Sequence, residues 1–367
     1  MTITVTDPGH RVPVYAPARS LSGTDDLHRE ARSGQAACEH PQMSALRDRS
    51  VGRIAVVGGG ALGSLVAARL AAAGGDPIVV SRPSPHLAAV ARNGVVVREL
   101  DGRLHTVPVR VATDPDEVAA ATLLFVCVKT WATAEALAPL APFLPPDALV
   151  VSLQNGLGNA ERIGDALPAH AGRVALGVTA LGAARRAPGE VRVGGSGPTI
   201  IGYPGRLPDA ALRDVAAAMQ AAGMPAATVG DIDRWVWRKL AVNAAINGLT
   251  ALAGVPNGQV AADPRLRAAA AQIAAEVETV ALAEGHDIPD AVPAALEVAR
   301  ATAANRSSML QDLEAGRRTE VDAIHGAVVD RAARHGIVVP ATELVWALVS
   351  ARSASHHDRN RREEALP

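Results

Sequence analysis

The sequence predicts an α/β N-terminal domain built on a doubly wound parallel sheet, followed by an all-α C-terminal domain. Up to about residue 229, short apolar runs alternate with helix-forming stretches, an order typical of parallel strands joined by crossover helices. From Asp231 onward, apolar residues recur at helical spacing instead. The clearest stripe, with spacings of 4, 3, 4 and 3, consists of Leu266, Ala270, Ile273, Val277 and Val280.

These patterns divide the 367 residues into four segments. Residues 1–50 mix Pro, Ser, Gly, Asp, Arg and His with little periodicity, and we expect them to form a disordered N-terminal extension. Residues 51–229 make up the predicted sheet domain, and residues 230–355 make up the helical domain. Residues 356–367 are mostly polar and predict a frayed tail.

Composition excludes several function classes. The formal net charge is −1 and aromatic residues make up 2% of the chain, which argues against nucleic acid or an anionic membrane as a partner. No apolar run reaches membrane-spanning length. The two cysteines, Cys38 and Cys127, offer neither a disulfide framework nor a zinc site, so we expect a cytoplasmic protein without a bound metal. The oligomeric state stays open, with a homodimer as one option.

A glycine-rich turn stands at the start of the sheet domain. The apolar strand at 54–57 is followed by glycines in G-x-G-x-x-G spacing and then by an Ala-rich helix to about residue 73. Strand, tight turn and helix in this register are typical of a Rossmann-type domain that binds a dinucleotide through the helix N-terminus. The alternative is a turn that binds no ligand. The expected cofactor contacts are Gly58, Gly60, Ala61, Leu62 and Gly63.

The end of the next strand indicates which dinucleotide binds. Residues 78–80 begin this strand, and Ser81 and Arg82 follow them. No carboxylate at this strand end is placed to bind the ribose 2′-hydroxyl of NAD. The guanidinium of Arg82 suits a 2′-phosphate, which favours NADP, reduced to NADPH, as the cofactor. The alternative is that Arg82 is a solvated loop charge.

The remaining elements of the sheet domain follow in chain order. The sequence predicts strands at 95–98, 107–111, 122–128, 148–153, within 173–202 and at 226–229, and helices at 86–94, 132–144 and 208–222. Lys129 and Asn155 follow two of these strands directly. Ligands bind at the carboxyl ends of parallel strands, so we expect Lys129, Asn155 and the glycine turn to meet at one crevice.

The helical domain carries a line of polar residues on an apolar background. Lys239, Asn243 and Asn247 are spaced at i, i+4 and i+8, which places them on one helix face. A lysine among apolar neighbours should be partly desolvated, which lowers its pKa and makes it a usable proton donor. The alternative is a lysine that extends to solvent beside two amides at a helix end. Further helices are expected at 294–313, 319–335 and 342–353.

A carboxylate stands at the start of one of these helices. Thr319 is a plausible N-cap, so Glu320 falls in the first helical turn. Periodicity alone favours the interpretation that Glu320 complements the helix dipole. Ser307 and Ser308 lie near the end of the preceding helix and alone indicate little.

Five ordered stretches across both domains carry a family resemblance. The chain from about residue 53 to residue 350 resembles the ketopantoate reductase (2-dehydropantoate 2-reductase) family. The matching stretches are VGGGALGS (57–64), VCVKTW (126–131), SLQNGLGN (152–159), WRKLAVNAAINGLTALAGVPNG (237–258), and NRSSMLQDLEAGRRTEVDAIHG (305–326) with HGIVVP (335–340).

The resemblance implies reduction of the 2-oxo group of ketopantoate by NADPH to give pantoate, for pantothenate and coenzyme A synthesis. It places the catalytic lysine at Lys239 and the catalytic glutamate at Glu320. The implied substrate-binding residues are Asn243, Asn247, Ser308 and Asn155, and the implied cofactor-binding residues include Lys129, Asn155 and Arg82. Two alternatives stay open: a related reductase of another small 2-oxo acid, and a non-catalytic NADP-binding sensor.

Overall fold

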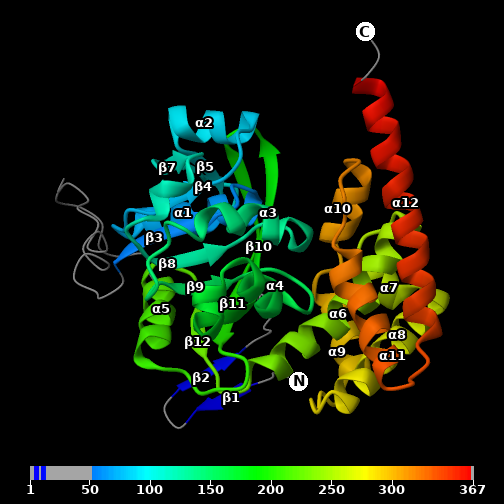
Figure 1. Ribbon diagram of the computed structural model, residues 1–367. Helices are drawn as coiled ribbons and strands as arrows, with labels where there is room; N and C mark the ends of the chain where they lie inside the picture. Colours follow the sequence, from blue (N-terminus) through cyan, green and yellow to red (C-terminus); the bar gives the residue numbers. More distant parts are fainter. Residues whose placement is uncertain (1–3, 8–9, 14–51, 365–367) are drawn as a thin grey trace, which may run out of the picture.

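The computed structural model describes residues 4–7, 10–13 and 52–364. It contains two units that stand side by side, a sheet unit and a helical unit, with helix α6 (Ile232–Ala253) running from the first into the second (Figure 1). In the first segment, β1 (Thr4–Asp7) pairs with β2 (His10–Pro13). The rest of the extension predicted at 1–50 lies outside the described residues, so its disorder stays a prediction.

The sheet unit is built on ten strands with helices on both faces. The strands are β3 (Arg53–Val57), β4 (Ile78–Val80), β5 (Val95–Arg98), β6 (Leu104–Val107), β7 (Arg110–Ala112), β8 (Ala121–Val126), β9 (Leu149–Ser152), β10 (Val174–Ala187), β11 (Glu190–Gly202) and β12 (Ala226–Thr228). Their order is β6-β5-β11-β10-β9-β8-β3-β4-β7, with β12 beside β11. Most pairs are parallel, as predicted, but β10 with β11 and β5 with β6 are antiparallel hairpins.

Two apolar cores, one on each face, hold the helices to this sheet. The helices are α1 (Ala61–Ala72), α2 (Pro85–Asn93), α3 (Thr133–Leu137), α4 (Asn159–Ala166) and α5 (Ala210–Ala221). Alternate residues of one strand enter different cores: Val56 belongs to the core that includes residues of α1 and α5, whereas Val57 belongs to the core that includes residues of α3 and α4. The strands are therefore covered on both sides, as their continuous apolar sequences require.

The helical unit surrounds α6. Its other helices are α7 (Gly258–Ala262), α8 (Pro264–Ala283), α9 (Ala291–Ala301), α10 (Ser308–Glu314), α11 (Ala327–Arg334) and α12 (Pro340–Glu364), and a π-helical turn, η5, spans Asp322–Gly326. The stripe predicted in α8 enters the core at Ala270, Ile273, Val277 and Val280. Helix α12 continues through most of the segment predicted as a polar tail.

Three predicted elements are wrong in detail. The helix expected at 132–144 is interrupted after Leu137, because Pro139 and Pro142 lack the N–H groups that a continuous helix needs. The helix expected at 294–313 is two helices, because the chain between them turns to accept hydrogen bonds from the N–H groups of Asn257 and Gly258. The strand expected at 107–111 is split between β6 and β7.

Candidate active site between the two units

The glycine turn has the geometry of a phosphate-binding turn. Gly58 has a φ of +105°, a conformation that favours glycine, and its N–H donates to the carbonyl of Val80. A Cβ on Gly63 would lie 2.0 Å from the carbonyl oxygen of Gly58, so a larger residue would separate α1 from the turn. A Cβ on Gly60 would meet open space, and no side chain caps the helix start there. The backbone N–H groups of Ala61 and Leu62 in the first turn of α1 can therefore serve a ligand.

Arg82 lies two residues beyond β4, where the sequence placed it. Its guanidinium pairs with the carboxylate of Glu135 on α3 at 2.8 Å, and both side chains are exposed. An exposed pair of this kind contributes about 0–1 kcal/mol, so the guanidinium can exchange this partner for a phosphate at little cost. The segment that follows is fixed by the buried His86, whose Nε2 lies 3.0 Å from Ser64 Oγ.

The carboxyl ends of β3, β8 and β9 lie next to each other, because these strands are neighbours in the sheet. The glycine turn, Lys129 and Asn155 therefore share one edge of the sheet. The loop that holds Asn155 is fixed on both sides. Asn159 Nδ2 donates to the carbonyls of Asn155 and Gly156, and Leu157 N–H donates to the carbonyl of Ala323 in the helical unit.

Glu320 joins the two units. Its buried carboxylate accepts hydrogen bonds from Lys129 Nζ at 3.3 Å, from the Thr130 N–H at 3.2 Å and from Asn155 Nδ2 at 3.4 Å. The Thr130 hydroxyl also donates to it at 3.5 Å, and all four donors belong to the sheet unit. Thr319, the predicted N-cap, accepts a hydrogen bond from the Val321 N–H, so Glu320 stands at a helix start as expected.

Lys129 binds a second carboxylate. Its Nζ lies 2.8 Å from Asp312 Oδ2 on α10, and Asp312 also binds Arg317. Burial lowers the pKa of Lys129, but Glu320 and Asp312 together outweigh burial, so the pKa lies above its usual value. Lys129 is therefore a fixed positive charge in this arrangement.

Lys239, on α6, has a different environment. Its Nζ donates to the backbone carbonyl of Thr179 at 2.9 Å. Burial lowers the pKa of Lys239 from 10.5 to about 8, although Glu320 raises it in part. This ammonium group is protonated at neutral pH and can release its proton more readily than an ordinary lysine.

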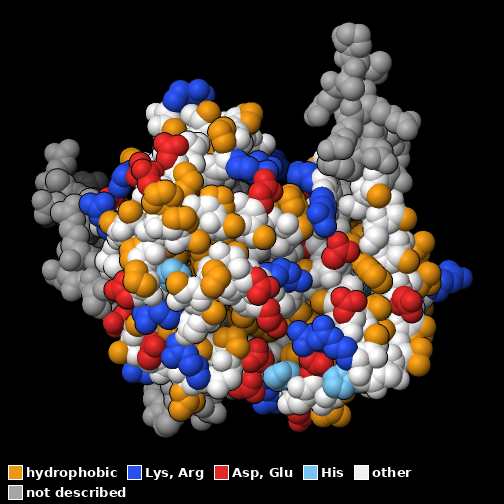
Figure 2. Space-filling model, viewed as in Figure 1, with side chains coloured by type: hydrophobic (Ala, Val, Ile, Leu, Met, Phe, Trp, Pro, Cys, Tyr) orange, Lys and Arg blue, Asp and Glu red, His pale blue; other side chains and the backbone are white. Residues whose placement is uncertain are grey.

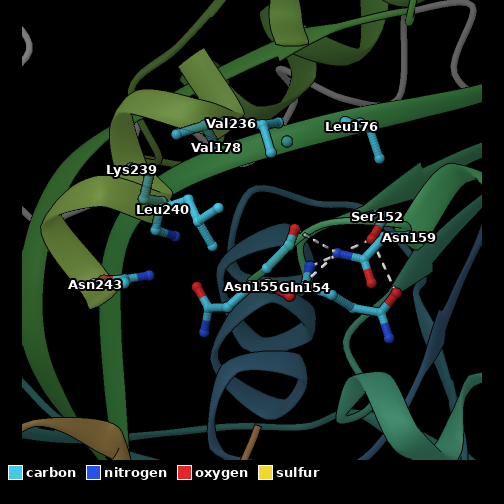
Figure 3. Close-up of a pocket in the computed structure, with 12 residues that line it drawn as sticks. Ser152, Gln154, Asn155, Asn159, Leu176, Val178, Val236, Lys239, Leu240 and Asn243 are labelled. Atoms are coloured by element: carbon cyan, nitrogen blue, oxygen red, sulfur yellow. Dashed lines mark hydrogen bonds between the residues drawn. The ribbon is translucent and has the colours of Figure 1, made fainter. Parts of the chain in front are cut away.

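Figure 3 shows that Lys239 and Asn243, one turn apart on α6, face Asn155 across a cleft. Its apolar lining consists of Leu176, Val178, Val236 and Leu240, and its polar lining includes Ser152, Gln154, Asn155, Asn159, Lys239 and Asn243. The structure thus combines an amine of lowered pKa with amide groups in one cleft.

Two other predicted residues, Asn247 and Ser308, are not among the residues that line this cleft. Asn247 is buried one turn beyond Asn243 on α6, and Ser308 is the exposed first residue of α10. The adjacent Ser307 has a structural role: its Oγ accepts hydrogen bonds from Leu310 N–H and from Thr250 Oγ1.

Sequence reasoning missed four partners: Thr130, Asp312, Thr179 and His325. His325 lies in the π-helical turn, fully buried, with Nε2 3.0 Å from the carbonyl of Ala244 on α6. Burial lowers its pKa to about 4, so it is neutral and ties the segment of Glu320 to the helix of Lys239. Composition offered one signal for two of these partners. Lys129 and Lys239 are the only lysines in the sequence, and their amines bind Asp312 and Thr179.

Two classes of site are absent from the part of the chain that the structure describes. Within residues 52–354, no group of three or more His, Cys, Asp or Glu side chains could hold a metal ion. None of the described helices is long and apolar enough to cross a membrane.

Comparison with known proteins identifies relatives over both units. The family models described as "Ketopantoate reductase PanE/ApbA" and "Ketopantoate reductase PanE/ApbA C terminal" match residues 54–206 and 231–353. The chain is 43% identical to a 2-dehydropantoate 2-reductase of Halobacterium salinarum, over 81% of this chain and 97% of the relative.

Solved structures agree with this. A 2-dehydropantoate 2-reductase from Geobacter metallireducens has a TM-score of 0.76 and 33% identity, with 82% of this chain and 99% of that chain covered. D-mandelate dehydrogenase, solved with NADH and anilino(oxo)acetate, shares the fold with a TM-score of 0.77 at 24% identity, over 83% of this chain and 99% of that chain. On the family models and the sequence identity, the chain belongs to the ketopantoate reductase family.

Proposed function

We propose that this protein reduces 2-dehydropantoate to pantoate with NADPH, a step of pantothenate and coenzyme A synthesis. The relatives that carry the name 2-dehydropantoate 2-reductase support the reaction. The single observation that supports it most is the position of Lys239, an amine with a pKa lowered to about 8, in a cleft that also holds Asn155 and Asn243. A carbonyl reduction needs such a proton donor, because negative charge develops on the carbonyl oxygen.

The sheet unit would hold the cofactor. The open side of Gly60 and the free N–H groups at the start of α1 fit a pyrophosphate, and Arg82 fits a 2′-phosphate. NADPH supplies a hydride when bound. Lys129 and Asn155 stand at the strand ends toward which the nicotinamide end would extend, and both are already fixed by Glu320.

The helical unit would hold the substrate and supply the proton. Lys239 donates a proton to the carbonyl oxygen as that oxygen gains charge. Glu320 accepts four hydrogen bonds, about the number that a carboxylate offers, and the longest comes from Thr130 Oγ1 at 3.5 Å. A substrate hydroxyl would take the place of that donor. Asn243, Asn247 and Ser308 would orient the substrate and bind its carboxylate. The site lies between the units, so we expect them to close on the ligands.

The test is the loss of NADPH absorbance in the presence of 2-dehydropantoate, run beside a panel of other 2-oxo acids and beside NADH. We expect the highest kcat/KM for 2-dehydropantoate with NADPH. A higher value for another 2-oxo acid would assign the protein to a related reductase. Binding of NADPH without turnover of any acid would make it a sensor. Lys239→Ala, which lacks the proposed proton donor, is the control variant and should show little turnover.

We place the reaction in the cytoplasm, because the chain has only two cysteines and no disulfide framework. A homodimer stays a prediction that the molecular mass in solution tests.

A further inference from the structure

The acceptor that holds the amine of Lys239 is a backbone carbonyl left free by the sheet. Strand β9 pairs with β10 only over residues 174–176 and ends at Ser152, opposite Leu176. Thr179 lies three residues beyond that point, so β9 has no residue opposite it. The carbonyl of Thr179 instead accepts the hydrogen bond from Lys239 Nζ. The position of the amine therefore depends on how Thr179 is held.

Thr179 is held from its other side by a buried pair of hydroxyl groups. Thr179 Oγ1 lies 2.7 Å from Thr199 Oγ1 on β11, and it also accepts a hydrogen bond from the Leu181 N–H at 3.0 Å. Thr179 and Thr199 are 7% and 1% exposed, so neither hydroxyl depends on water. Thr199 is itself fixed, because its N–H donates to the carbonyl of Pro225.

The hydroxyl pair also stands where the ladder becomes irregular. Thr179 is opposite Thr199, but Leu181 is opposite Ser196, so β11 has one more residue than β10 across this step. A β-bulge of this kind interrupts the regular hydrogen bonds and redirects the chain beside it. Side-chain hydrogen bonds then have to fix the local geometry that the ladder no longer fixes.

We propose that Thr199 is a positioning residue that acts through Thr179, holding its carbonyl oxygen against the amine of Lys239 and so fixing the proton donor. This inference rests on the proposed function for its catalytic consequence, but the position of the amine can be measured without turnover. Neither threonine lines the cleft or touches the expected substrate, so both act through Lys239.

The charges around Lys239 make its titration a clean measurement. Glu320 is the carboxylate that acts on the amine, and Lys129 and Asp312 lie beyond it in the same network. The charged residues of β10 and β11 stand at the far end of the hairpin, at Arg185, Arg186, Glu190 and Arg192. Loss of the carbonyl acceptor would disfavour the ammonium form, so the amine should titrate at lower pH.

The experiment compares Thr199→Ala with Thr199→Ser. Both variants remove the methyl group, but only Ser keeps a hydroxyl for Thr179. Because the sequence has two lysines, protein labelled with 13C at lysine Cε gives two signals, and Lys129→Arg assigns them. We expect the Lys239 signal of Thr199→Ala to titrate lower by about half a pH unit or more, while Thr199→Ser titrates like the unaltered protein.

Turnover provides the second readout. Thr199→Ala should lower kcat by roughly 10- to 100-fold, the scale expected when a catalytic group is misplaced, and the alkaline limit of the rate should move with the Lys239 signal. Thr342→Ala is the matched control: Thr342 is fully buried, and its hydroxyl binds Glu276 on α8, away from the cleft. It should lower thermal stability and leave the titration unchanged.

The results separate this inference from the proposed function. If Thr199→Ala lowers stability and the Lys239 titration stays the same as in Thr199→Ser, Thr199 is merely structural and the inference is wrong. If the titration shifts but the unaltered protein reduces no 2-oxo acid, the positioning role holds and the proposed function fails. The Ala and Ser variants both place a smaller residue in the site, so overpacking cannot obscure the comparison.

Discussion

The two lysines of this protein belong to different units and have opposite environments. Lys129, from the sheet unit, binds the carboxylates of Asp312 and Glu320, and its pKa lies above the usual value. Lys239, from the helical unit, binds a backbone carbonyl, and burial lowers its pKa to about 8. Both side chains are only partly exposed, so the difference shows that the partner, and not burial alone, determines which amine can release a proton.

Charged side chains also lie between the two units. Figure 2 shows positive and negative side chains along the boundary between the two units, and one of the ion pairs that cross it joins Arg331 of α11 to Glu161 of α4. Ion pairs join the units at this boundary, whereas the amine of Lys239 binds a backbone carbonyl.

The largest effect should come from Lys239→Ala. If Lys239 is the proton donor, its loss should lower kcat by roughly 100-fold or more and leave the affinity for NADPH nearly unchanged. Lys129→Ala should instead weaken the contact between the units and the binding of cofactor. Steady-state kinetics with an NADPH titration of both variants decides this. A near-normal kcat for Lys239→Ala would mean that the proton comes from another group.

Arg82→Ala should affect only the binding of the cofactor. If Arg82 binds the 2′-phosphate, its loss should remove most of the preference for NADPH over NADH, about 1–3 kcal/mol for a charge-assisted contact. Titration of the variant with both cofactors measures the preference directly. Equal affinities of the unaltered protein for NADPH and NADH would contradict the assignment, and kcat at saturating NADPH should change little.

Glu320→Gln tests the carboxylate that the two lysines share. Glu320 raises the pKa of both amines, so its neutralisation should lower both. For Lys239 the alkaline limit of turnover, expected near pH 8, should therefore move to lower pH by roughly one unit. Substrate binding should also weaken, because the proposed hydrogen bond to the substrate hydroxyl loses its charge. An alkaline limit that does not move would show that Glu320 does not raise the pKa of Lys239.

Thermal stability should respond in opposite directions at the two lysines. The pKa of Lys239 is lower in the folded protein, so between about pH 8 and 10.5 the unfolded chain binds more protons and stability rises with pH. Below pH 8 the buried ammonium is destabilising, and Lys239→Met should raise the Tm at pH 7 by roughly 2–4 °C. Lys129→Met should lower it, because Asp312 and Glu320 lose their counterion. Calorimetry of both variants at pH 7 checks the signs.

The sequence could predict the elements whose signals are local. The glycine turn, the strand ends at Lys129 and Asn155, and the polar line from Lys239 are all visible within short windows. The structure places the first three at neighbouring strand ends and brings Asn155, Lys239 and Asn243 to one cleft. The break in the helix expected at 132–144 was also visible, since Pro139 and Pro142 stand in the sequence. Neither proline has the N–H group that a continuous helix needs at that position.

The contacts that tune the site could not be predicted in this way. Asp312 meets Lys129 across 183 residues, and its sequence surroundings resemble an ordinary helix. The partner of Lys239 is a backbone carbonyl, which every residue has. It is available only because β9 ends before it reaches Thr179, and that depends on the lengths of strands far apart in the sequence.

The loop after β9 has a consequence for how the chain folds. Leu157 belongs to the sheet unit by sequence, yet its side chain is part of the apolar core of the helical unit, and its N–H binds Ala323 there. Each unit alone would lack part of its native surroundings: one would expose Leu157, and the other would contain a cavity in its place. We therefore expect the two units to unfold in a single cooperative transition, and not one after the other.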